Sequence, residues 1–379
     1  MVSSRQQKLS LPLQEAVVHR RQLILGALGT GLSAASSAAL GQVPAGIRSG
    51  GQACLHAAIP FGAAIRVDLL QENLEYRRAV LGHCQWVVGE GGLKWIDVRP
   101  EADRFVFDQP DRLLAFADAN GMRMRGHTLV WHGAMPKWTE AIATRADAER
   151  ILQAHIDTVV SRYRGRIPSW DVVNEAIAEH PTADSPLRKS VWLDRLGPDY
   201  VEMALRRTAA VDPATQLVIN EYGFENPTAQ CRAKREAFLR LVRKLKDRDV
   251  PLHAVGLQGH LPGELEIDRD GLSRFVAELH GMGLRILVTE LDVIDDKLTR
   301  DRTLRDEIVA SRVKLFLQAI GDVCRPEVVI TWGITDQYTW VPIWFRRKDG
   351  EPNRPLPLDA NYRPKPMMRE IRDFTRARN

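Results

Sequence analysis

The chain has 379 residues, of which 44% are hydrophobic and 27% charged, and one barrel domain of this size is ordinary. Its 53 basic and 48 acidic residues give a formal net charge of +5 and are spread without a basic tract or interleaved aromatic residues. This distribution argues against nucleic-acid binding, and we expect one folded domain that is a monomer.

The beginning of the chain differs from the rest. Arg20 and Arg21 precede an apolar stretch rich in Ala, Gly and Ser that runs to about Leu40. This pattern resembles a twin-arginine export signal, which predicts a periplasmic or extracellular protein without membrane attachment after signal removal. A membrane anchor is the alternative, although the apolar stretch is short for a spanning helix. We therefore expect an export signal at 1–41 and the folded domain at 42–379.

Strand-like and helix-like segments alternate through that domain. Eight apolar, β-rich runs are expected to be strands, namely 61–64, 85–88, 124–131, 169–174, 216–220, 254–258, 285–290 and 328–332. Apolar residues recur three and four apart in the expected helices, which include 148–163, 200–211, 233–246, 272–279, 304–320 and 367–375. A long surface loop is expected at 346–357. The alternation predicts an α/β fold with a parallel sheet, and polar or aromatic residues at several strand ends favour a closed (β/α)8 barrel over an open sheet.

Two of the predicted strands end on a glutamate. The sequence Trp-Asp-Val-Val-Asn-Glu ends at Glu175, and Ile-Leu-Val-Thr-Glu ends at Glu290. Ligands of parallel β/α folds lie beyond the carboxyl ends of the strands, so both carboxylates are expected in one pocket. A retaining glycosidase needs such a pair about 5 Å apart, because one carboxyl protonates the leaving oxygen while the other attacks the sugar.

Other strand ends carry motifs that occur together. The third strand leads into His132, Pro136 and Trp138, the sixth gives Gly-Leu-Gln-Gly-His at 256–260, and the eighth gives Thr-Trp-Gly-Ile-Thr-Asp at 331–336. In this order the motifs resemble family 10 of the glycoside hydrolases, the endo-β-1,4-xylanases, from about residue 61 to 366. The resemblance implies a retaining enzyme that cleaves internal β-1,4 bonds of xylan and xylo-oligosaccharides without a cofactor or metal.

The resemblance also implies roles for the residues around the two glutamates. Glu175 matches the general acid/base, whose pKa is expected to be raised, and Glu290 matches the nucleophile. His260 matches the histidine that hydrogen-bonds the nucleophile, and Asp292 is placed to orient that imidazole. Asn174 matches the residue that binds the sugar 2-hydroxyl beside the cleaved bond.

Substrate-binding positions follow from the same resemblance. On the glycone side they are Glu90, Lys94, His132, Gln258, Trp332 and Trp340, and a looser match places Asn220 and Tyr222 on the aglycone side. Gly91 stands where the family usually has Asn, so one amide contact to a remote xylose is missing. We expect this change to weaken remote glycone binding and to leave the proton chemistry alone.

The remaining candidates have simpler interpretations. We expect a buried core position for His127, packing positions for Trp86, Trp95, Trp131 and Trp170, and exposed positions for Glu179, Glu225 and Glu278. Cys54, Cys84, Cys231 and Cys324 lack metal-site spacing and are expected to be buried small apolar residues.

Two other functions remain open at this stage. The same machinery could act on another β-linked glycan, such as a glucan, because only the subsite contacts would differ. A non-catalytic carbohydrate-binding barrel is disfavoured, because it would not need both carboxylates with their histidine and asparagine supports.

Overall fold

Eight parallel strands form a closed barrel at the centre of the computed structural model, which describes residues 58–376. The barrel strands are β1 (Phe61–Ile65), β2 (Trp86–Gly89), β3 (Arg123–Val130), β4 (Ser169–Asn174), β5 (Gln216–Glu221), β6 (Ala254–Leu257), β8 (Arg285–Ile294) and β9 (Val329–Thr331). They pair in this order, and β9 pairs with β1 to close the barrel. The predicted (β/α)8 fold is therefore confirmed. The predicted export signal at 1–41 and the start of the predicted domain lie outside the described residues.

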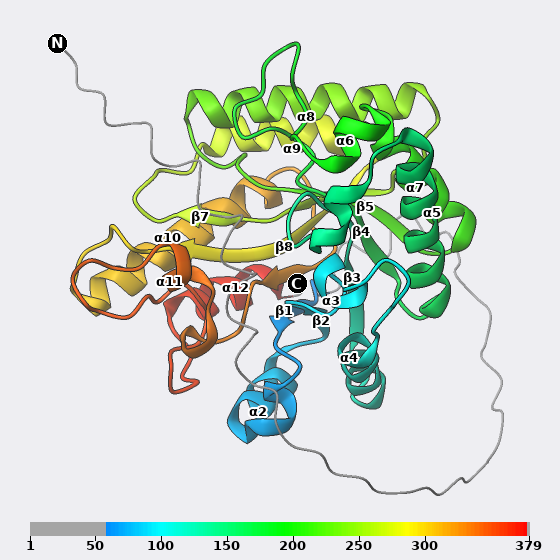
Figure 1. The fold of residues 1–379 in the computed structure, drawn as a ribbon. Helices are drawn as coiled ribbons and strands as arrows, with labels where there is room; N and C mark the ends of the chain where they lie inside the picture. Colours follow the sequence, from blue (N-terminus) through cyan, green and yellow to red (C-terminus); the bar gives the residue numbers. More distant parts are fainter. Residues whose placement is uncertain (1–57, 377–379) are drawn as a thin grey trace, which may run out of the picture.

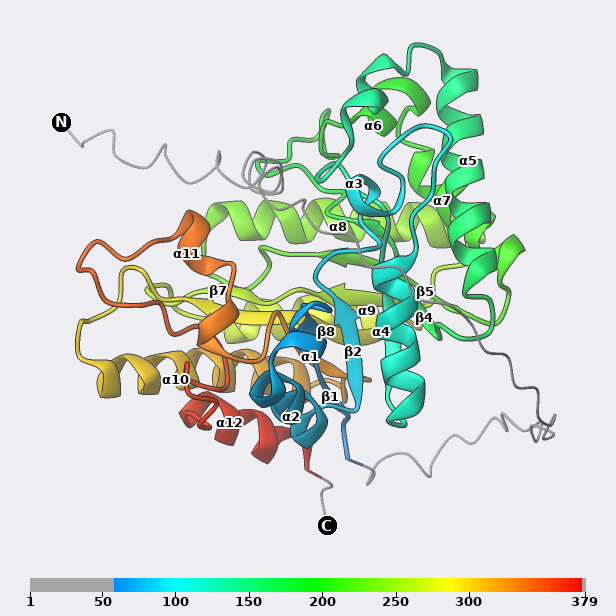
Figure 2. The same ribbon diagram turned by 60° about the horizontal axis from the view of Figure 1, so that its bottom comes forward.

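Helices surround the barrel, as Figures 1 and 2 show. The longer ones are α2 (Leu74–His83), α4 (Asp108–Ala119), α5 (Arg145–Arg162), α7 (Tyr200–Val211), α8 (Ala229–Asp247), α9 (Arg269–Gly281), α10 (Arg302–Gly321) and α12 (Pro366–Thr375). Short helices lie in the loops, namely α1 (Leu69–Glu72), α3 (Trp95–Val98), α6 (Val191–Leu196) and α11 (Val341–Trp344), with 3-10 turns at Lys137–Ala141 and Asp336–Tyr338. Each of the six predicted helices is present, with ends that differ by up to four residues.

Helix starts are set by capping side chains. The hydroxyl of Thr144 accepts a hydrogen bond from the backbone N–H of Asp147, so α5 begins three residues before the expected start. Thr228, Asp268 and Asp301 cap α8, α9 and α10 in the same manner. Such caps satisfy N–H groups that have no partner within the helix.

The barrel interior is filled by small and branched side chains. It contains Ala64, Val88, Val218, Ala254, Leu287, Val328 and Ile330, with Trp332 at one end. Strand residues are buried on both faces, because the opposite faces pack against the helices. At Gly126 of β3 an added Cβ would lie 2.0 Å from the Trp170 ring, so only glycine permits this close approach. The expected packing role of Trp170 is thus confirmed.

The segment 346–357 is irregular, as expected, and residues 346, 348–350 and 352 are exposed, but other parts of it are buried. Arg347, Asn353 and Leu356 are buried. The amide of Asn353 and the backbone N–H of Arg354 both donate to the carboxylate of Asp295, which follows β8. Polar groups of this segment therefore donate hydrogen bonds to a buried carboxylate.

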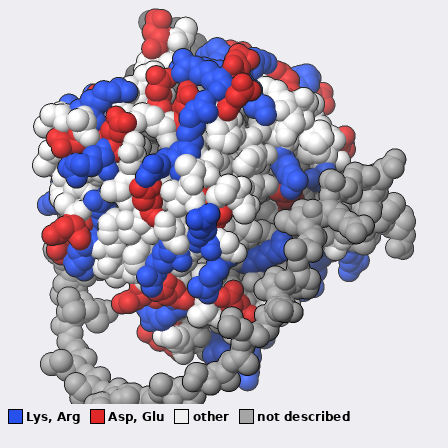
Figure 3. Space-filling view, turned by 90° about the vertical axis from the view of Figure 1, so that its right-hand side faces the viewer, with Lys and Arg blue, Asp and Glu red and all other residues white. Residues whose placement is uncertain are grey.

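Charged side chains of both signs are interspersed on the side of the molecule that Figure 3 shows. Ion pairs between neighbouring elements include Arg162 of α5 with Asp111 of α4 and Arg207 of α7 with Asp157 of α5. Within residues 58–376 no helix is long and apolar enough to cross a membrane.

Candidate active site

Glu175 lies directly after β4 and has an unusual backbone conformation. Its φ of 56° is in the left-handed region, which residues other than glycine adopt at a cost. Its N–H donates to the carbonyl of Asn220 (2.8 Å), and its carbonyl accepts from Nε of Arg188 (3.2 Å). The carboxylate accepts from Nε1 of Trp131 (2.8 Å) and from Nε2 of Gln258 (3.3 Å). Backbone and side chain are therefore both held in place.

Glu290 lies inside β8 and is only 5% exposed. The strand was expected to end at this residue, but it continues to Ile294 because its outer part pairs with an additional short strand, β7 (His260–Pro262). Oε1 of Glu290 accepts from Nδ2 of Asn220 (2.6 Å), and Oε2 lies 3.3 Å from Nε2 of His260.

His260 connects Glu290 to a second carboxylate. Its Nδ1 lies 2.8 Å from Oδ1 of Asp292, and Oδ2 of Asp292 accepts from Nε1 of Trp340 (2.7 Å). Burial lowers the pKa of His260, but the charges of and hydrogen bonds to Asp292 and Glu290 outweigh burial and raise this pKa well above its usual value. The imidazole is therefore positively charged at neutral pH and balances the two carboxylates.

Side-chain amides link the two glutamates. Nδ2 of Asn220 donates to Oδ1 of Asn174 (2.8 Å) as well as to Glu290, and Nε2 of Gln258 donates to Asn174 (3.3 Å) as well as to Glu175. A chain of hydrogen bonds thus runs from Glu290 through three amides to Glu175. The two carboxylates belong to one site.

The expected aglycone contact of Asn220 does not agree with its position. The side chain is fully buried, and its carbonyl oxygen accepts from the Thr289 hydroxyl (2.6 Å) while its amide serves Asn174 and Glu290. All of its polar atoms are used by the protein. Asn220 therefore holds the carboxylate of Glu290 and does not present a group to a sugar.

Tyr222 lies just beyond β5 in a separate polar cluster. Its hydroxyl donates to Oε2 of Glu179 (2.6 Å) and accepts from Nη2 of Arg188 (2.8 Å). Nζ of Lys234 lies 3.7 Å from the centroid of the Tyr222 ring, and it also pairs with Glu221 (3.2 Å). This cluster adjoins Glu175 through Arg188.

The pKa of Glu175 is lowered in this structure, to about 2, although we expected it to be raised. Burial does raise the pKa, but the charges of His132 and Arg188 and the hydrogen bonds from Trp131 and Gln258 outweigh it. Burial also lowers the pKa of His132 to about 4, so His132 is neutral near pH 7 and Arg188 supplies the positive charge there. The expectation of a raised pKa for Glu175 considered only repulsion from the second carboxylate, that of Glu290.

The predicted glycone residues lie at neighbouring strand ends. Nζ of Lys94 is 5.3 Å from the ring centroid of Trp131 and 5.4 Å from that of Trp332, and Nδ1 of His132 is 3.8 Å from Oε2 of Glu175. Nδ1 of His132 and Oε1 of Gln258 are buried without a hydrogen-bond partner within the described residues. The described protein therefore leaves the hydrogen-bonding capacity of these two atoms unused.

Glu90 directly follows β2, beside Gly91. Burial raises its pKa to about 7, against the opposing charges of Arg66 and Lys94. Its protonation therefore changes near neutral pH.

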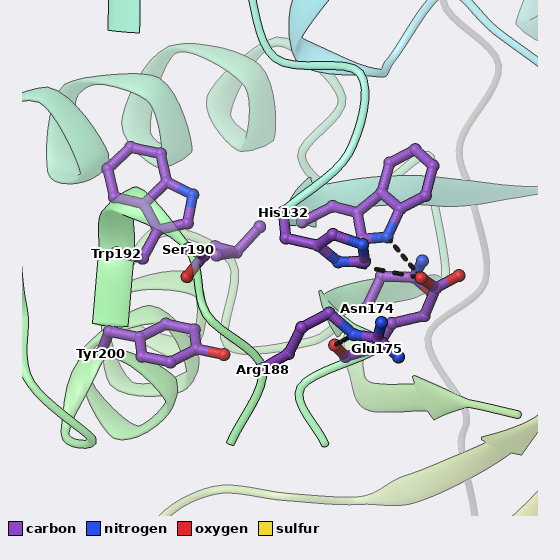
Figure 4. Close-up of a pocket in the computed structure, with 9 residues that line it drawn as sticks. His132, Asn174, Glu175, Arg188, Ser190, Trp192 and Tyr200 are labelled. Carbon is purple, nitrogen blue, oxygen red and sulfur yellow. Dashed lines mark hydrogen bonds and ion pairs between the residues drawn. The ribbon is translucent and has the colours of Figure 1, made fainter. Parts of the chain in front are cut away.

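A pocket lies beside Glu175 and His132 (Figure 4). Arg188 and Ser190 line it between Glu175 and the two aromatic residues Trp192 and Tyr200 at its other end. No group of three His, Cys, Asp or Glu side chains in the described part of the chain could hold a metal ion. The chemistry available here is that of two carboxylates with a charged imidazole and several amides.

Comparison with known proteins identifies the family. The model of glycosyl hydrolase family 10 matches residues 51–374. The chain belongs to glycosyl hydrolase family 10. The resemblance noted from the strand-end motifs is thereby confirmed over nearly the whole described structure.

Relatives of this family 10 chain have been named and solved. A β-1,4-xylanase from Dictyoglomus thermophilum is 34% identical over 79% of this chain and 84% of that protein. An exoglucanase, XynX, from Acetivibrio thermocellus is 30% identical over 84% of this chain, but the match spans only 29% of that longer protein. The crystal structure of xylanase 10B from Thermotoga petrophila in complex with xylobiose has a TM-score of 0.76 and 30% identity, and covers 84% of this chain and 94% of that one.

Several positions in this family 10 site differ from expectation. Trp131 was expected to pack in the core, but it donates to the acid/base candidate Glu175. Glu225 was expected to be exposed but is 1% exposed, and Glu179 is partly buried in the cluster with Tyr222. The position of Trp131, one residue before His132 at a strand end, is the sequence signal that could have placed it at the site.

Other expectations agree with the structure. His127 is buried, with Nδ1 3.0 Å from Asp171, and its ring packs edge-on against Trp332. Trp95 is buried and Glu278 is exposed. Cys84, Cys231 and Cys324 carry free thiols. Cys84 and Cys231 are buried as expected, Cys324 is only partly buried, and Cys54 lies outside the described residues.

Proposed function

We propose that this chain hydrolyses internal β-1,4 bonds of xylan with retention at the anomeric carbon, using Glu290 as nucleophile and Glu175 as general acid/base. The observation that carries the proposal is the chain of amide hydrogen bonds that joins these two carboxylates in a family 10 barrel. The name of the 34% identical relative, a β-1,4-xylanase, supports xylan as the substrate.

In the first step, Glu290 attacks the anomeric carbon while Glu175 gives its proton to the leaving oxygen. The amide of Asn220 and the imidazolium of His260 hold the Glu290 carboxylate in position, and Asp292 fixes the imidazolium. Both contacts of Asn174 with its neighbours use its carbonyl oxygen, so its amide nitrogen remains available to the sugar 2-hydroxyl.

In the second step, Glu175 removes a proton from water, which attacks the glycosyl ester and releases Glu290. Its carboxylate is well suited to this role, because Arg188 and the donors Trp131 and Gln258 stabilise the anion. For the first step it needs a proton, which requires that a bound sugar, by removing residual water, raise the pKa of Glu175 in the substrate complex.

Sugar recognition is assigned to the groups around this centre. Lys94, His132 and Gln258 offer polar atoms to hydroxyls, and Trp332 and Trp340 offer apolar faces to the sugar rings. Because Gly91 lacks the usual amide, one hydrogen bond to a remote xylose is lost. Such a loss is worth about 0.5 to 1.5 kcal/mol, or roughly threefold to tenfold in affinity.

The test replaces each glutamate in turn. Glu290→Ala should retain less than about a hundredth of the activity on xylan, because it cannot form the covalent intermediate. Glu175→Ala should lose much more activity on substrates with poor leaving groups than on aryl xylosides with good ones, which do not need the proton. Equal losses on both substrates would count against the acid role.

A second substrate class is suggested by the relative named an exoglucanase. The same carboxylate pair would cleave a β-glucan if the glycone subsites accepted the additional hydroxymethyl group of glucose. Rates on xylo-oligosaccharides and cello-oligosaccharides of equal length decide between the two, and we expect the xylo-oligosaccharides to react faster.

We further propose that the protein is exported by the twin-arginine route. The pair Arg20-Arg21 before an apolar stretch supports this, and the family match begins only at residue 51. Replacing both arginines by lysine should leave the enzyme in the cytoplasm of the producing cell. Unchanged export of the double variant would contradict the proposal.

A further inference from the structure

Arg188 is placed beside Glu175 by the loop between β4 and α6. After Glu175 the chain moves away from the barrel and returns, with an antiparallel bridge between Ile177 and Leu187 and a hydrogen bond from the N–H of Arg188 to the carbonyl of Ala176 (2.7 Å). The returning segment brings the guanidinium back to the residue from which the loop started, as Figure 4 shows.

The guanidinium holds the backbone of Glu175. Nε of Arg188 donates to the Glu175 carbonyl (3.2 Å), while the Glu175 N–H is bound to Asn220 on the other side. Glu175 has a positive φ, a conformation that a residue with a side chain keeps only when its surroundings fix it. Arg188 supplies one of the two contacts that do so.

The guanidinium is itself fixed by one partner in its own loop and one beyond β5. Its Nη2 donates to the hydroxyl of Tyr222 (2.8 Å) and to Oε2 of Glu179 (3.3 Å), and Glu179 accepts from Nε2 of Gln230 on α8 (2.7 Å). The side chain of Arg188 is 15% exposed, so its charge is only partly screened by water. Arg188 therefore acts on Glu175 in two ways, through a hydrogen bond to its carbonyl and through a weakly screened positive charge.

We propose that Arg188 is a positioning residue, which fixes the backbone of Glu175 and keeps a positive charge beside its carboxyl, so that proton transfer to the leaving group depends on it. This inference rests on the proposed role of Glu175 as general acid/base. Arg188 acts through Glu175 and is not required to touch the sugar.

The charge has a defined effect on the pH profile. The titratable and charged groups around Glu175 are His132 after β3, Glu179 and Arg188 in the loop, Glu221 and Tyr222 at the end of β5, Lys234 on α8, and His260 and Glu290 across the site. Arg188 lowers the pKa of Glu175, so its loss should raise this pKa. The negative charge of Glu179 partly offsets the positive charge of Arg188, so its loss should lower the pKa of Glu175.

The experiment compares Arg188→Met, Arg188→Lys and Glu179→Gln with the wild type. With each enzyme measured at its own pH optimum, Arg188→Met should lose roughly 10-fold to 100-fold in kcat/KM on a xylo-oligosaccharide. The loss should be less than about threefold on a dinitrophenyl xylobioside, whose leaving group needs no proton. In the pH profile of kcat/KM, the basic limb is the range in which activity falls as Glu175 loses its proton. This limb should move to higher pH in Arg188→Met and to lower pH in Glu179→Gln. Arg188→Lys keeps the positive charge but loses the planar set of N–H donors of the guanidinium. This variant should lose turnover without a shift of the basic limb of the pH profile.

Controls separate this inference from folding and from the proposed function. Arg206→Met removes an exposed arginine that pairs with Glu202, and it should retain the activity and pH profile of the wild type. If Arg188→Met does not fold, Arg188→Lys still decides the question, because it should lose activity on the xylo-oligosaccharide and keep it on the dinitrophenyl xylobioside. Equal losses on the two substrates, or limbs that stay within about 0.2 pH units in both variants, would overturn the role of Arg188. If wild type and Glu175→Ala show no dependence on the leaving group, the proposed acid role itself fails.

Discussion

At the scale of single residues, the site stabilises the anion of Glu175, which the proposed mechanism also uses as an acid. Arg188, Trp131 and Gln258 all favour the Glu175 carboxylate, and they lower its pKa in the free protein. A proton donor can work there only if substrate binding changes this balance.

The first prediction concerns this change. The basic limb of kcat/KM reports the pKa of the acid in the free enzyme, whereas that of kcat reports it in the substrate complex. We expect the limb of kcat to lie at higher pH, because a bound sugar removes water from Glu175 and burial raises a carboxyl pKa. Initial rates on a xylo-oligosaccharide up to pH 9 measure both, with the series extended down to about pH 2 to reach the pKa of the free enzyme. If the basic limbs of kcat and kcat/KM lie at the same pH, the bound sugar does not raise the pKa of Glu175.

The second prediction concerns His260. Its pKa is raised in the folded state, so the charged imidazole stabilises the fold fully below its unfolded pKa of about 6.5, and this contribution is lost as the pH rises through the folded pKa. The melting temperature of His260→Asn should therefore fall furthest below that of the wild type in mildly acidic solution, and the gap should close at alkaline pH. A gap that widens with pH would contradict a charged His260.

At the scale of elements, adjacent strands fit closely around Glu290, the proposed nucleophile. An added Cβ at Gly256 of β6 would lie 2.1 Å from Oδ1 of Asn220 and 2.9 Å from Cγ2 of Thr289. Asn220 would have to move away from Glu290. The glycine of a barrel strand is thus part of the catalytic arrangement.

The third prediction uses this contact. Gly256→Ala should cost about 1 to 3 kcal/mol of stability through overpacking and lower kcat by roughly 100-fold through the displaced amide. Gly82→Ala is the matched control, because its Cβ in α2 would meet no atom within 4 Å. That change should be active and more stable by about 0.5 to 1 kcal/mol. Near-normal turnover of Gly256→Ala would mean that Asn220 is not needed to position the nucleophile.

The sequence predicted the elements better than their ends. All eight barrel strands and the six named helices could be located, because buried strands and amphipathic helices leave periodic patterns over many residues. The extension of β8 to Ile294 could not, because it depends on pairing with the three-residue strand β7. Arg188 was also missed, because it lies in an irregular loop and reaches Glu175 only through the path of that loop.

At the scale of the whole molecule, a buried ionic cluster joins the end of β8, α10 and the segment 346–357. The carboxylate of Asp295 lies 3.5 Å from Nε of Arg305 and 3.9 Å from Nη1 of Arg347. The side chains of Asp295 and Arg305 have no exposed surface. Sequence reasoning placed part of this cluster in an exposed loop, because a polar segment gives no local sign that its partners are 50 residues away.

The fourth prediction concerns this cluster. Asp295→Asn should cost about 3 to 5 kcal/mol, because it leaves buried arginines without their counter-ion, and should lower the melting temperature by roughly 5 to 10 °C. Asp118→Asn breaks an exposed pair with Arg166 and should change stability by less than about 1 kcal/mol. Similar melting temperatures for the two variants would show that burial of the cluster does not matter for stability.

The most direct measurement of the proposed mechanism is the anomeric configuration of the first product. A nucleophile and an acid/base acting in two displacements must return the configuration of the β-linked substrate. Proton NMR during cleavage of a xylo-oligosaccharide should therefore show the β-anomer of the new reducing end first, with the α-anomer growing in later by mutarotation. Initial appearance of the α-anomer would mean a single displacement by water and would contradict the role of Glu290 as nucleophile.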